Sequence, residues 1–200
     1  PQSTATTCVK PSGTVSQLTD SASGIHARHA PYYVRTVRGD VKDSLTQFLM
    51  NQNIPNEPDF NSPSNTVVFS FPFKSPDAAI CRTDIKALEQ LHTWKRFSDH
   101  WCEHKPSVTV SVKEHEWIEV GNWCYKNFDS LSGISFLPFS DHSYRQAPYQ
   151  DSTKKDYNKL CAAMPKSINW KEFDNYEKED NTKASQELAC SAGVCEIVDI

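Results

Sequence analysis

The stretch Ser107-Val108-Thr109-Val110-Ser111-Val112 alternates strictly between polar and apolar side chains. A period of two residues is typical of a β-strand that lays one face on a core. One helix is predicted before this strand in the sequence and another after it. The preceding helix starts at Asp84 as its N-cap and is stopped by residues 103–106, and its inward side chains are Ile85, Leu88, Leu91, Trp94 and Trp101. The following helix carries one apolar stripe, made of Trp117, Val120, Cys124 and Phe128.

The same alternation of strands and helices extends to the rest of the chain. Further strands are predicted at residues 6–9, 32–38, 66–73 and 132–139, and further helices at 17–21, 43–49 and 153–164. A Pro/Asn-rich link covers residues 51–65. In the last helix we expect Tyr157, Leu160, Cys161 and Met164 to face inward. This order predicts the α/β class.

Composition limits the kinds of protein this can be. The 200 residues are 38% hydrophobic and 23% charged, which suits one globular domain with a core. With 21 basic and 25 acidic residues, the formal charge of -4 gives no general reason to bind nucleic acid or anionic lipid. No apolar run approaches the roughly 18 residues of a membrane span. We therefore expect a soluble, cytoplasmic protein, and because the chain starts at Pro1 without an initiator methionine, a piece of a longer polypeptide.

The seven cysteines fall into two groups. Five are scattered through predicted strands and helices, where a cysteine is more often a small buried apolar residue: Cys8, Cys81, Cys102, Cys124 and Cys161. Cys190 and Cys195 instead lie five positions apart near the chain end, after a polar, charged segment at 173–187 that resembles a flexible linker. An odd total argues against a disulfide scaffold.

Cys190 and Cys195 are candidates for a tethered redox pair. A mobile, exposed dithiol can reduce a disulfide elsewhere and then be reduced by an external dithiol protein. Two other interpretations remain open, namely an incidental pair of cysteines and half of a zinc site completed by histidines from elsewhere.

The loop Pro11-Ser12-Gly13-Thr14-Val15-Ser16 is a candidate anion site. It combines small side chains, hydroxyl groups and a glycine just before a predicted helix, where unpaired backbone N–H groups favour phosphate. It is not a Walker loop, because the Gly-x-x-x-x-Gly-Lys pattern is absent. A simple helix N-cap is the alternative, and it is the more common use of such a sequence.

These segments together resemble a known enzyme family. The run from Lys10 to Leu18, continued by residues 20–26 and 32–35, is similar to the phosphate-loop region of class II, adenosylcobalamin-dependent ribonucleotide reductases. Residues 101–110, 116–117, 133–138 and 144–149 resemble the monomeric ribonucleoside-triphosphate reductase branch. The final Cys-x-x-x-x-Cys is similar to the tail dithiol of class I and class II reductases.

The resemblance implies a division of the chain and a role for each part. Residues 1–172 would be the C-terminal part of a ten-stranded α/β barrel, residues 173–187 a flexible linker, and residues 188–200 a dithiol tail. The enzyme would convert ribonucleoside triphosphates to 2'-deoxyribonucleotides by thiyl radical chemistry that adenosylcobalamin starts. Ser12, Gly13, Thr14, Val15 and Ser16 would hold the substrate phosphates. Cys190 and Cys195 would reduce the active-site disulfide, and thioredoxin would then reduce the tail.

The resemblance also implies what this chain lacks. In the family, the radical cysteine lies before the phosphate loop, and only ten residues precede Pro11 here. We therefore expect the chain alone to be inactive and its partner to be the upstream part of the same enzyme. Residues 136–139 read Phe-Leu-Pro-Phe where class I enzymes carry a tyrosine pair, which fits local radical generation.

Several histidines and arginines could help to hold substrate or cofactor, although surface charge is the commoner explanation: His26, Arg28, His29, Arg35 and Arg38. Nothing in the sequence places His104 or His142 near the corrin ring. The cobalamin site is therefore left unassigned. Two rival functions remain. One is a stand-alone phosphate-binding or thiol-exchange module, and the other is a zinc-binding structural protein, against which the lack of close Cys/His quartets argues. No metal site and no nucleic-acid or membrane partner is predicted.

Overall fold

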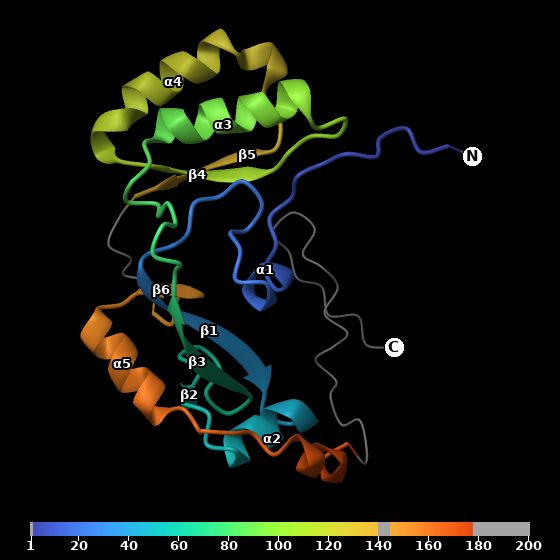
Figure 1. The fold of residues 1–200 in the computed structure, drawn as a ribbon, viewed down its shortest axis with the longest axis vertical. Coiled ribbons are helices and arrows are strands. Elements are labelled where there is room, and N and C mark those ends of the chain that lie inside the picture. The colour runs from blue at the N-terminus through green and yellow to red at the C-terminus, as the bar shows by residue number, and fades with distance from the viewer. Residues whose placement is uncertain (1, 140–144, 178–200) are drawn as a thin grey trace. The chain divides into compact units, whose positions relative to one another are not determined.

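A computed structural model of the chain describes residues 2–139 and 145–177. The described part divides into two compact units (Figure 1). The first contains residues 2–33 and 74–139, and the second contains residues 34–73 and 145–177.

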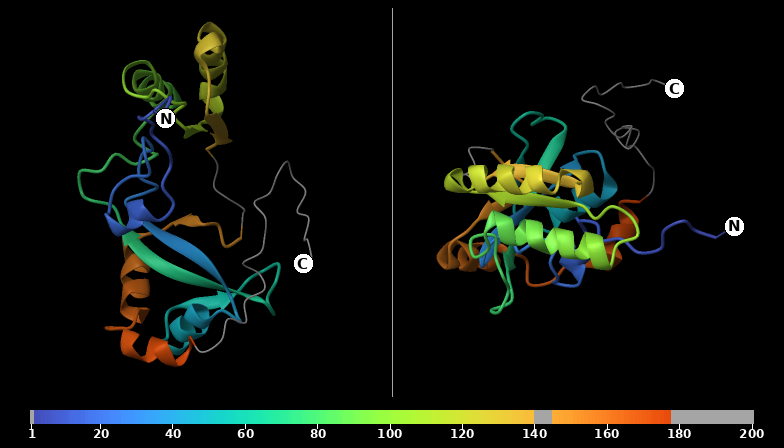
Figure 2. Two further views of the ribbon diagram at one scale, coloured as in Figure 1. Left: turned by 90° about the vertical axis from the view of Figure 1, so that its right-hand side faces the viewer. Right: turned by 90° about the horizontal axis from the view of Figure 1, so that it is seen from above.

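The first unit is built on a two-stranded parallel sheet. Strand β4 (Val108–Val112) pairs with β5 (Ile134–Pro138), and Val110 lies opposite Phe136. Helices α3 (Ala87–His100) and α4 (Trp117–Lys126) cover one face of this sheet (Figures 1 and 2). The short 3-10 helices η1 (Glu114–Glu116) and η2 (Phe128–Ser130) flank α4, and α1 (Val15–Leu18) is a single turn.

The core of the first unit follows the predicted periodicities. The alternation of β4 buries its valines against α3 and α4. The buried set is Ala87, Leu91, Trp94, Val108, Val110, Val112 and Val120. The strands and helices predicted around residues 84–139 are therefore confirmed in type and order.

Some details of the first unit differ from the predictions. Residues 6–9 are not a strand: Thr7 and Val9 accept hydrogen bonds from His104 and Ser107, which lie in an irregular segment and not in a strand. The N-cap of α3 is Lys86 and not Asp84, because Glu89 accepts from the Lys86 N–H at 2.8 Å. Asp84 instead accepts from the Cys81 N–H at 3.0 Å.

Three further predictions for this unit are wrong. The first helix spans Val15–Leu18 and not residues 17–21. Phe128 lies beyond the end of α4 and is 74% exposed, and Trp101 is 59% exposed. Helix ends are set by capping contacts that the apolar spacing alone does not reveal.

The second unit holds a four-stranded sheet in the order β2-β3-β1-β6. Its strands are β1 (Tyr32–Asp40), β2 (Asn56–Pro58), β3 (Thr66–Lys74) and β6 (Tyr149–Asp151). Strand β2 runs antiparallel to β3, with Asn56 opposite Phe69. The predicted link at 51–65 therefore contains a short strand. A small core of Ile54, Val67 and Phe69 packs with Leu49, Phe71 and Met164, among others.

Helices α2 (Ser44–Asn51) and α5 (Lys154–Ala163) are each capped by the side chain of the residue before them. The Asp43 carboxylate accepts from the Thr46 N–H at 2.9 Å, and the Thr153 hydroxyl accepts from the Asp156 N–H at 3.1 Å. Cys161 of α5 is exposed, so its predicted inward position is wrong.

The 3-10 helix η3 (Trp170–Asn175) lies against α2. The ring of Phe48 is fully buried, with the rings of Trp170, Phe173 and Tyr176 at 5.3, 5.3 and 5.6 Å. The predicted linker therefore begins with residues that are part of the packed unit, because Phe173 and Tyr176 contact Phe48 of α2. From residue 178 onward the linker and the dithiol tail lie outside the described residues.

The α/β class is thus confirmed, in two sheets each with its own helices. The ten-stranded barrel stays a prediction. Within the described ranges, no helix has both the length and the hydropathy that crossing a membrane requires.

Candidate functional site

The predicted anion loop is a compact turn held by its two serines. The Ser12 hydroxyl oxygen accepts from the Ser16 N–H at 3.0 Å, and the Ser16 hydroxyl donates to the Ser12 carbonyl at 2.7 Å. Ser16 is buried beneath the turn. The Ser16 side chain and N–H are therefore occupied in shaping the loop.

The three residues between these serines are exposed. Among the residues that the structure describes, none accepts a hydrogen bond from the backbone N–H of Gly13, Thr14 or Val15. Thr14 precedes α1 without a capping bond from its hydroxyl. Three consecutive free N–H groups beside a free hydroxyl are donors that an oxyanion can accept from.

All five residues predicted to bind phosphate lie in one turn. They differ in their hydrogen bonding. Gly13, Thr14 and Val15 offer free donors, whereas Ser12 and Ser16 hold the turn together. A Cβ placed on Gly13 would meet no atom within 4 Å. The space in front of this peptide is therefore open to a ligand.

Residues 20–28 lie beside the loop and carry two of the predicted polar side chains, His26 and Arg28. The Arg28 guanidinium is 6% exposed, forms an ion pair with Asp20 and donates to the Ser21 carbonyl at 2.6 Å. Its Nε is buried without a partner among the described residues. The main chain of Arg28 bonds to Ile80 and Arg82, which fixes the residue from a second side.

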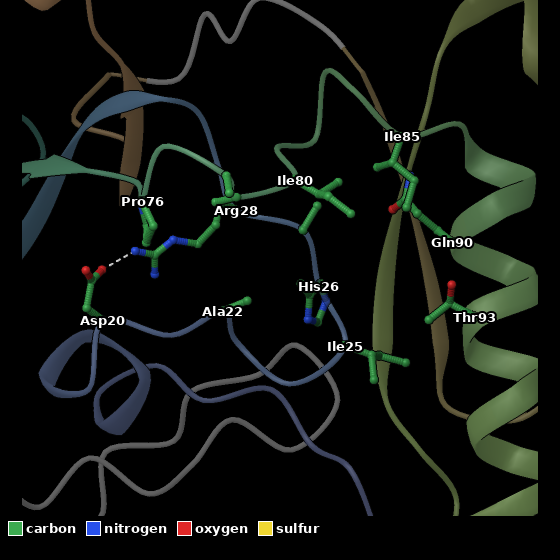
Figure 3. Close-up of a pocket in the computed structure, with 13 residues that line it drawn as sticks. Asp20, Ala22, Ile25, His26, Arg28, Pro76, Ile80, Ile85, Gln90 and Thr93 are labelled. Carbon is green, nitrogen blue, oxygen red and sulfur yellow. Dashed lines mark hydrogen bonds and ion pairs between the residues drawn. The ribbon is translucent and has the colours of Figure 1, made fainter.

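A cavity of about 440 Å³ opens next to this ion pair (Figure 3). Its walls come from three segments of the first unit, namely residues 20–28, 76–80 and 85–93. They are mainly aliphatic, with Ile25, Ile80 and Ile85 among them, and Gln90 and Thr93 add polar groups. This is the size of a site for a small organic ligand.

A cobalamin does not fit this cavity, because its corrin ring with amide side chains and nucleotide loop is much larger than such a ligand. This cavity is accordingly not its site. Among them, no group of three or more His, Cys, Asp or Glu side chains could hold a metal ion.

The other predicted polar residues have structural partners. Arg35 lies over the Tyr149 ring at 4.5 Å. Arg38 pairs with Asp59 at 2.9 Å. Burial raises the pKa of Asp59, but hydrogen bonds from Arg38, Ser62 and Asn61 outweigh that effect and leave this pKa below its ordinary value. Both arginines thus stabilise the second unit.

The predicted histidines and cysteines are dispersed. His29 packs edge-on against Tyr33 at 5.7 Å between ring centroids, and His104 accepts from the Lys105 N–H at 2.8 Å. Cys8 and Cys161 are exposed, contrary to the expected burial, whereas Cys81 is buried and Cys102 and Cys124 are partly buried. Burial raises the pKa of the Cys81 and Cys124 thiols, which keeps them protonated and unreactive. His142, Cys190 and Cys195 lie outside the described residues.

Sequence reasoning missed one feature of the site, the role of Ser23. Its hydroxyl oxygen accepts from the Ser12 N–H at 2.7 Å and so fixes the start of the loop. A serine eleven positions away in an irregular segment gives no sequence signal for this contact.

Comparison with known proteins gives a consistent result. A protein of Dictyostelium discoideum named probable adenosylcobalamin-dependent ribonucleoside-triphosphate reductase is 29% identical over 99% of this chain. The adenosylcobalamin-dependent ribonucleoside-triphosphate reductases of Lactobacillus helveticus and Euglena gracilis are 26% and 29% identical over 96% and 84% of it. The chain spans about a quarter of these relatives, 26%, 26% and 23% of their lengths. No family model matches the sequence.

The fold agrees with the sequence comparison. A crystal structure of a B12-dependent class II ribonucleotide reductase matches 84% of this chain with a TM-score of 0.70 and 24% identity, and the match covers 24% of that protein. The family resemblance is therefore confirmed: over nearly its whole length the chain is similar to a segment that makes up about a quarter of each of these adenosylcobalamin-dependent reductases, and its fold is similar to that of a class II ribonucleotide reductase.

Proposed function

We propose that this chain is the C-terminal portion of an adenosylcobalamin-dependent ribonucleoside-triphosphate reductase of the cytoplasm. The observation that carries the proposal is the match over 96–99% of the chain to reductases of this one activity. In the longer protein, residues 1–172 would contribute to a ten-stranded barrel. The cofactor would supply the radical that starts replacement of the ribose 2'-hydroxyl by hydrogen.

The loop from Ser12 to Ser16 would bind the triphosphate of the substrate. The free N–H groups of Gly13, Thr14 and Val15 support this role, because backbone donors can bind phosphate oxygens without an added charge. The reciprocal Ser12–Ser16 bonds support it too, since they hold these donors in one conformation. The loop would position the ribose and take no part in bond breaking.

The tail cysteines would regenerate the active site after each turnover. The thiolate of one, Cys190 or Cys195, would attack a sulfur of the active-site disulfide and form a mixed disulfide. The second tail thiolate would resolve it, leaving two reduced active-site thiols and a Cys190–Cys195 disulfide. A dithiol protein of the thioredoxin type would then supply two electrons and two protons to the tail. The spacing of the two cysteines, beyond the polar segment 173–187, supports this proposal.

Reduction of a ribonucleoside triphosphate with adenosylcobalamin and a dithiol tests the proposal. The chain would be assayed alone and joined to an upstream polypeptide, either its own or that of a relative such as the Lactobacillus helveticus enzyme. We expect deoxyribonucleotide only from the joined protein. A well-folded joined protein without activity would contradict the proposal. It would favour a stand-alone phosphate-binding or thiol-exchange module, which needs neither cobalamin nor an upstream part.

A further inference from the structure

His26 links the core of the first unit to the loop. Its Nε2 lies 2.9 Å from the backbone nitrogen of Thr109 in β4, and its Nδ1 lies 2.6 Å from the Ser23 carbonyl oxygen. A backbone N–H can only donate, so Nε2 must be the unprotonated acceptor. Nδ1 then carries the ring proton and donates to Ser23. Both ring nitrogens are used, and the contacts define one neutral tautomer.

Ser23 in turn is hydrogen-bonded to the loop. Its hydroxyl oxygen accepts from the Ser12 N–H at 2.7 Å. Ser12 in turn forms both bonds to Ser16. Separate hydrogen bonds therefore join β4, whose Val108 and Val110 are buried, to the His26 ring, the His26 ring to the Ser23 carbonyl, and the Ser23 hydroxyl to the start of the loop.

The segment between Ser23 and His26 lies directly against the strand-like residues before the loop. Gly24 has a φ of +61°, and a Cβ on it would come within 2.7 Å of the Lys10 carbonyl oxygen. Only glycine allows this approach without strain. The close fit holds Ser23 at a defined distance from Lys10 and hence from Ser12.

The far end of the loop is held independently. The Ser21 N–H donates to the Ser16 carbonyl at 2.9 Å, and Arg28 bonds to the Ser21 carbonyl and to Asp20. Both ends of the loop are thus fixed, one by His26 and the other by Arg28. The three free N–H groups lie between these two ends.

We propose that His26 is a positioning residue for the phosphate loop. It does not bind the ligand, but it fixes Ser23 and Ser12 so that the N–H groups of Gly13, Thr14 and Val15 are ordered before an anion arrives. Ordering a loop in advance removes part of the entropic cost of binding. The inference rests on the proposed function of this loop in binding the triphosphate group.

Binding of inorganic triphosphate to the chain, measured by calorimetry, tests the inference. His26→Ala removes both ring contacts, and we expect affinity to fall about tenfold, the effect of one ordinary hydrogen bond. His26→Asn keeps a donor that can reach the Ser23 carbonyl, so it should retain more affinity than His26→Ala. The exposed His115 provides the matched control, because none of the described residues is a hydrogen-bond partner of its side chain, and His115→Ala should bind as the wild type does.

Two spectroscopic readouts separate positioning from general destabilisation. Nitrogen NMR of the wild type should show Nε2 of His26 unprotonated and Nδ1 protonated. Amide exchange at Ser12 should be faster in His26→Ala, while exchange at buried β4 residues such as Val110 stays slow. A lower melting temperature with unchanged affinity and unchanged Ser12 exchange would overturn the positioning role.

The outcomes also separate this inference from the proposed function. A wild-type chain that does not bind triphosphate would overturn the binding role of the loop and the positioning role with it. Triphosphate binding that is the same in the wild type and His26→Ala would overturn only the role of His26.

Discussion

The buried carboxylate of Glu116 accepts a hydrogen bond from the backbone N–H of Ala87, the first residue of α3, at 3.2 Å. Its other oxygen accepts from the Lys113 N–H at 2.9 Å. One side chain from the start of α4 therefore satisfies a helix end that lies 29 positions earlier in the chain. A negative group at this end also interacts favourably with the helix dipole.

Glu116→Ala is expected to lower the free energy of unfolding by about 1–3 kcal/mol, because it leaves the buried N–H of Ala87 and the partly buried N–H of Lys113 without acceptors. Urea denaturation followed by tryptophan fluorescence measures the change. Glu114→Ala, at an exposed position of the same 3-10 helix, should change stability by less than about 0.5 kcal/mol. Equal effects of the two substitutions would contradict the role of Glu116.

Glu103 should make attachment of the N-terminal segment depend on pH. Hydrogen bonds from the Thr6 N–H, the Thr6 hydroxyl and the Thr7 N–H hold the pKa of the Glu103 carboxyl below its ordinary value. A depressed pKa means that the carboxylate stabilises the attached state fully above the ordinary glutamate pKa of about 4.3. This stabilisation is lost as the pH falls through the lower, folded-state value.

The amide signals of Thr6 and Thr7 in NMR spectra should therefore shift on acidification with a midpoint below pH 4.3, about the value for free glutamate. Glu103→Gln should abolish this transition, because the amide does not titrate. A midpoint at or above the value for free glutamate would show that these contacts do not favour the charged form.

Gly13→Val should separate binding from folding. A Cβ at Gly13 would meet no atom within 4 Å, so we expect the free energy of unfolding to change by less than about 0.5 kcal/mol. Affinity for inorganic triphosphate should fall, because the valine crowds the place where the phosphates would lie. Unchanged affinity in a folded variant would remove the loop from the site.

Gly24→Ala is the matched comparison for Gly13→Val. Its backbone has a φ of +61° and its Cβ would press on the Lys10 carbonyl, so a loss of about 1–3 kcal/mol in unfolding free energy is expected. If both glycine variants are equally stable, the close approach of Gly24 to Lys10 is not a constraint.

Cys190→Ser, made in the joined enzyme, should abolish turnover with thioredoxin as reductant. Turnover with a small dithiol should persist, because such a reductant reaches the active-site disulfide without the tail. Deoxyribonucleotide formation with each reductant is the measurement, and Cys161→Ser, at an exposed cysteine outside the tail, is the control. Equal loss of activity with both reductants would contradict a shuttle role for Cys190.

Local contacts explain which parts of the fold could be predicted from sequence. The Asp43 cap is a bond between residues three apart, and the alternation of β4 reflects a single buried face, so both are present in short windows. Residues 6–9 have strand-like composition, but Thr6 is bound to Glu103, 97 positions away, and no strand pairs with this segment in the described part of the chain. No pattern within residues 6–9 indicates such a partner.

In the candidate site too, local features could be predicted from the sequence, whereas contacts between distant residues could not. The site's small residues and glycine predicted an anion loop, and among the described residues three backbone N–H groups there have no acceptor; anion binding itself stays a prediction. The supporting contacts were not predictable, because the partner of His26 in β4 is 83 positions away and Ser23 has no distinctive surroundings in the sequence.

The aromatic contacts around Phe48 set an upper limit on the distance between the second unit and Cys190. Trp170, Phe173 and Tyr176 pack on that ring, so the chain beyond Tyr176 starts from a fixed anchor. Cys190 follows Tyr176 by fourteen positions. Even a fully extended chain covers at most about 3.6 Å per residue, or roughly 50 Å in all. If the tail acts as proposed, the disulfide that it reduces lies inside a sphere of that radius around the anchor.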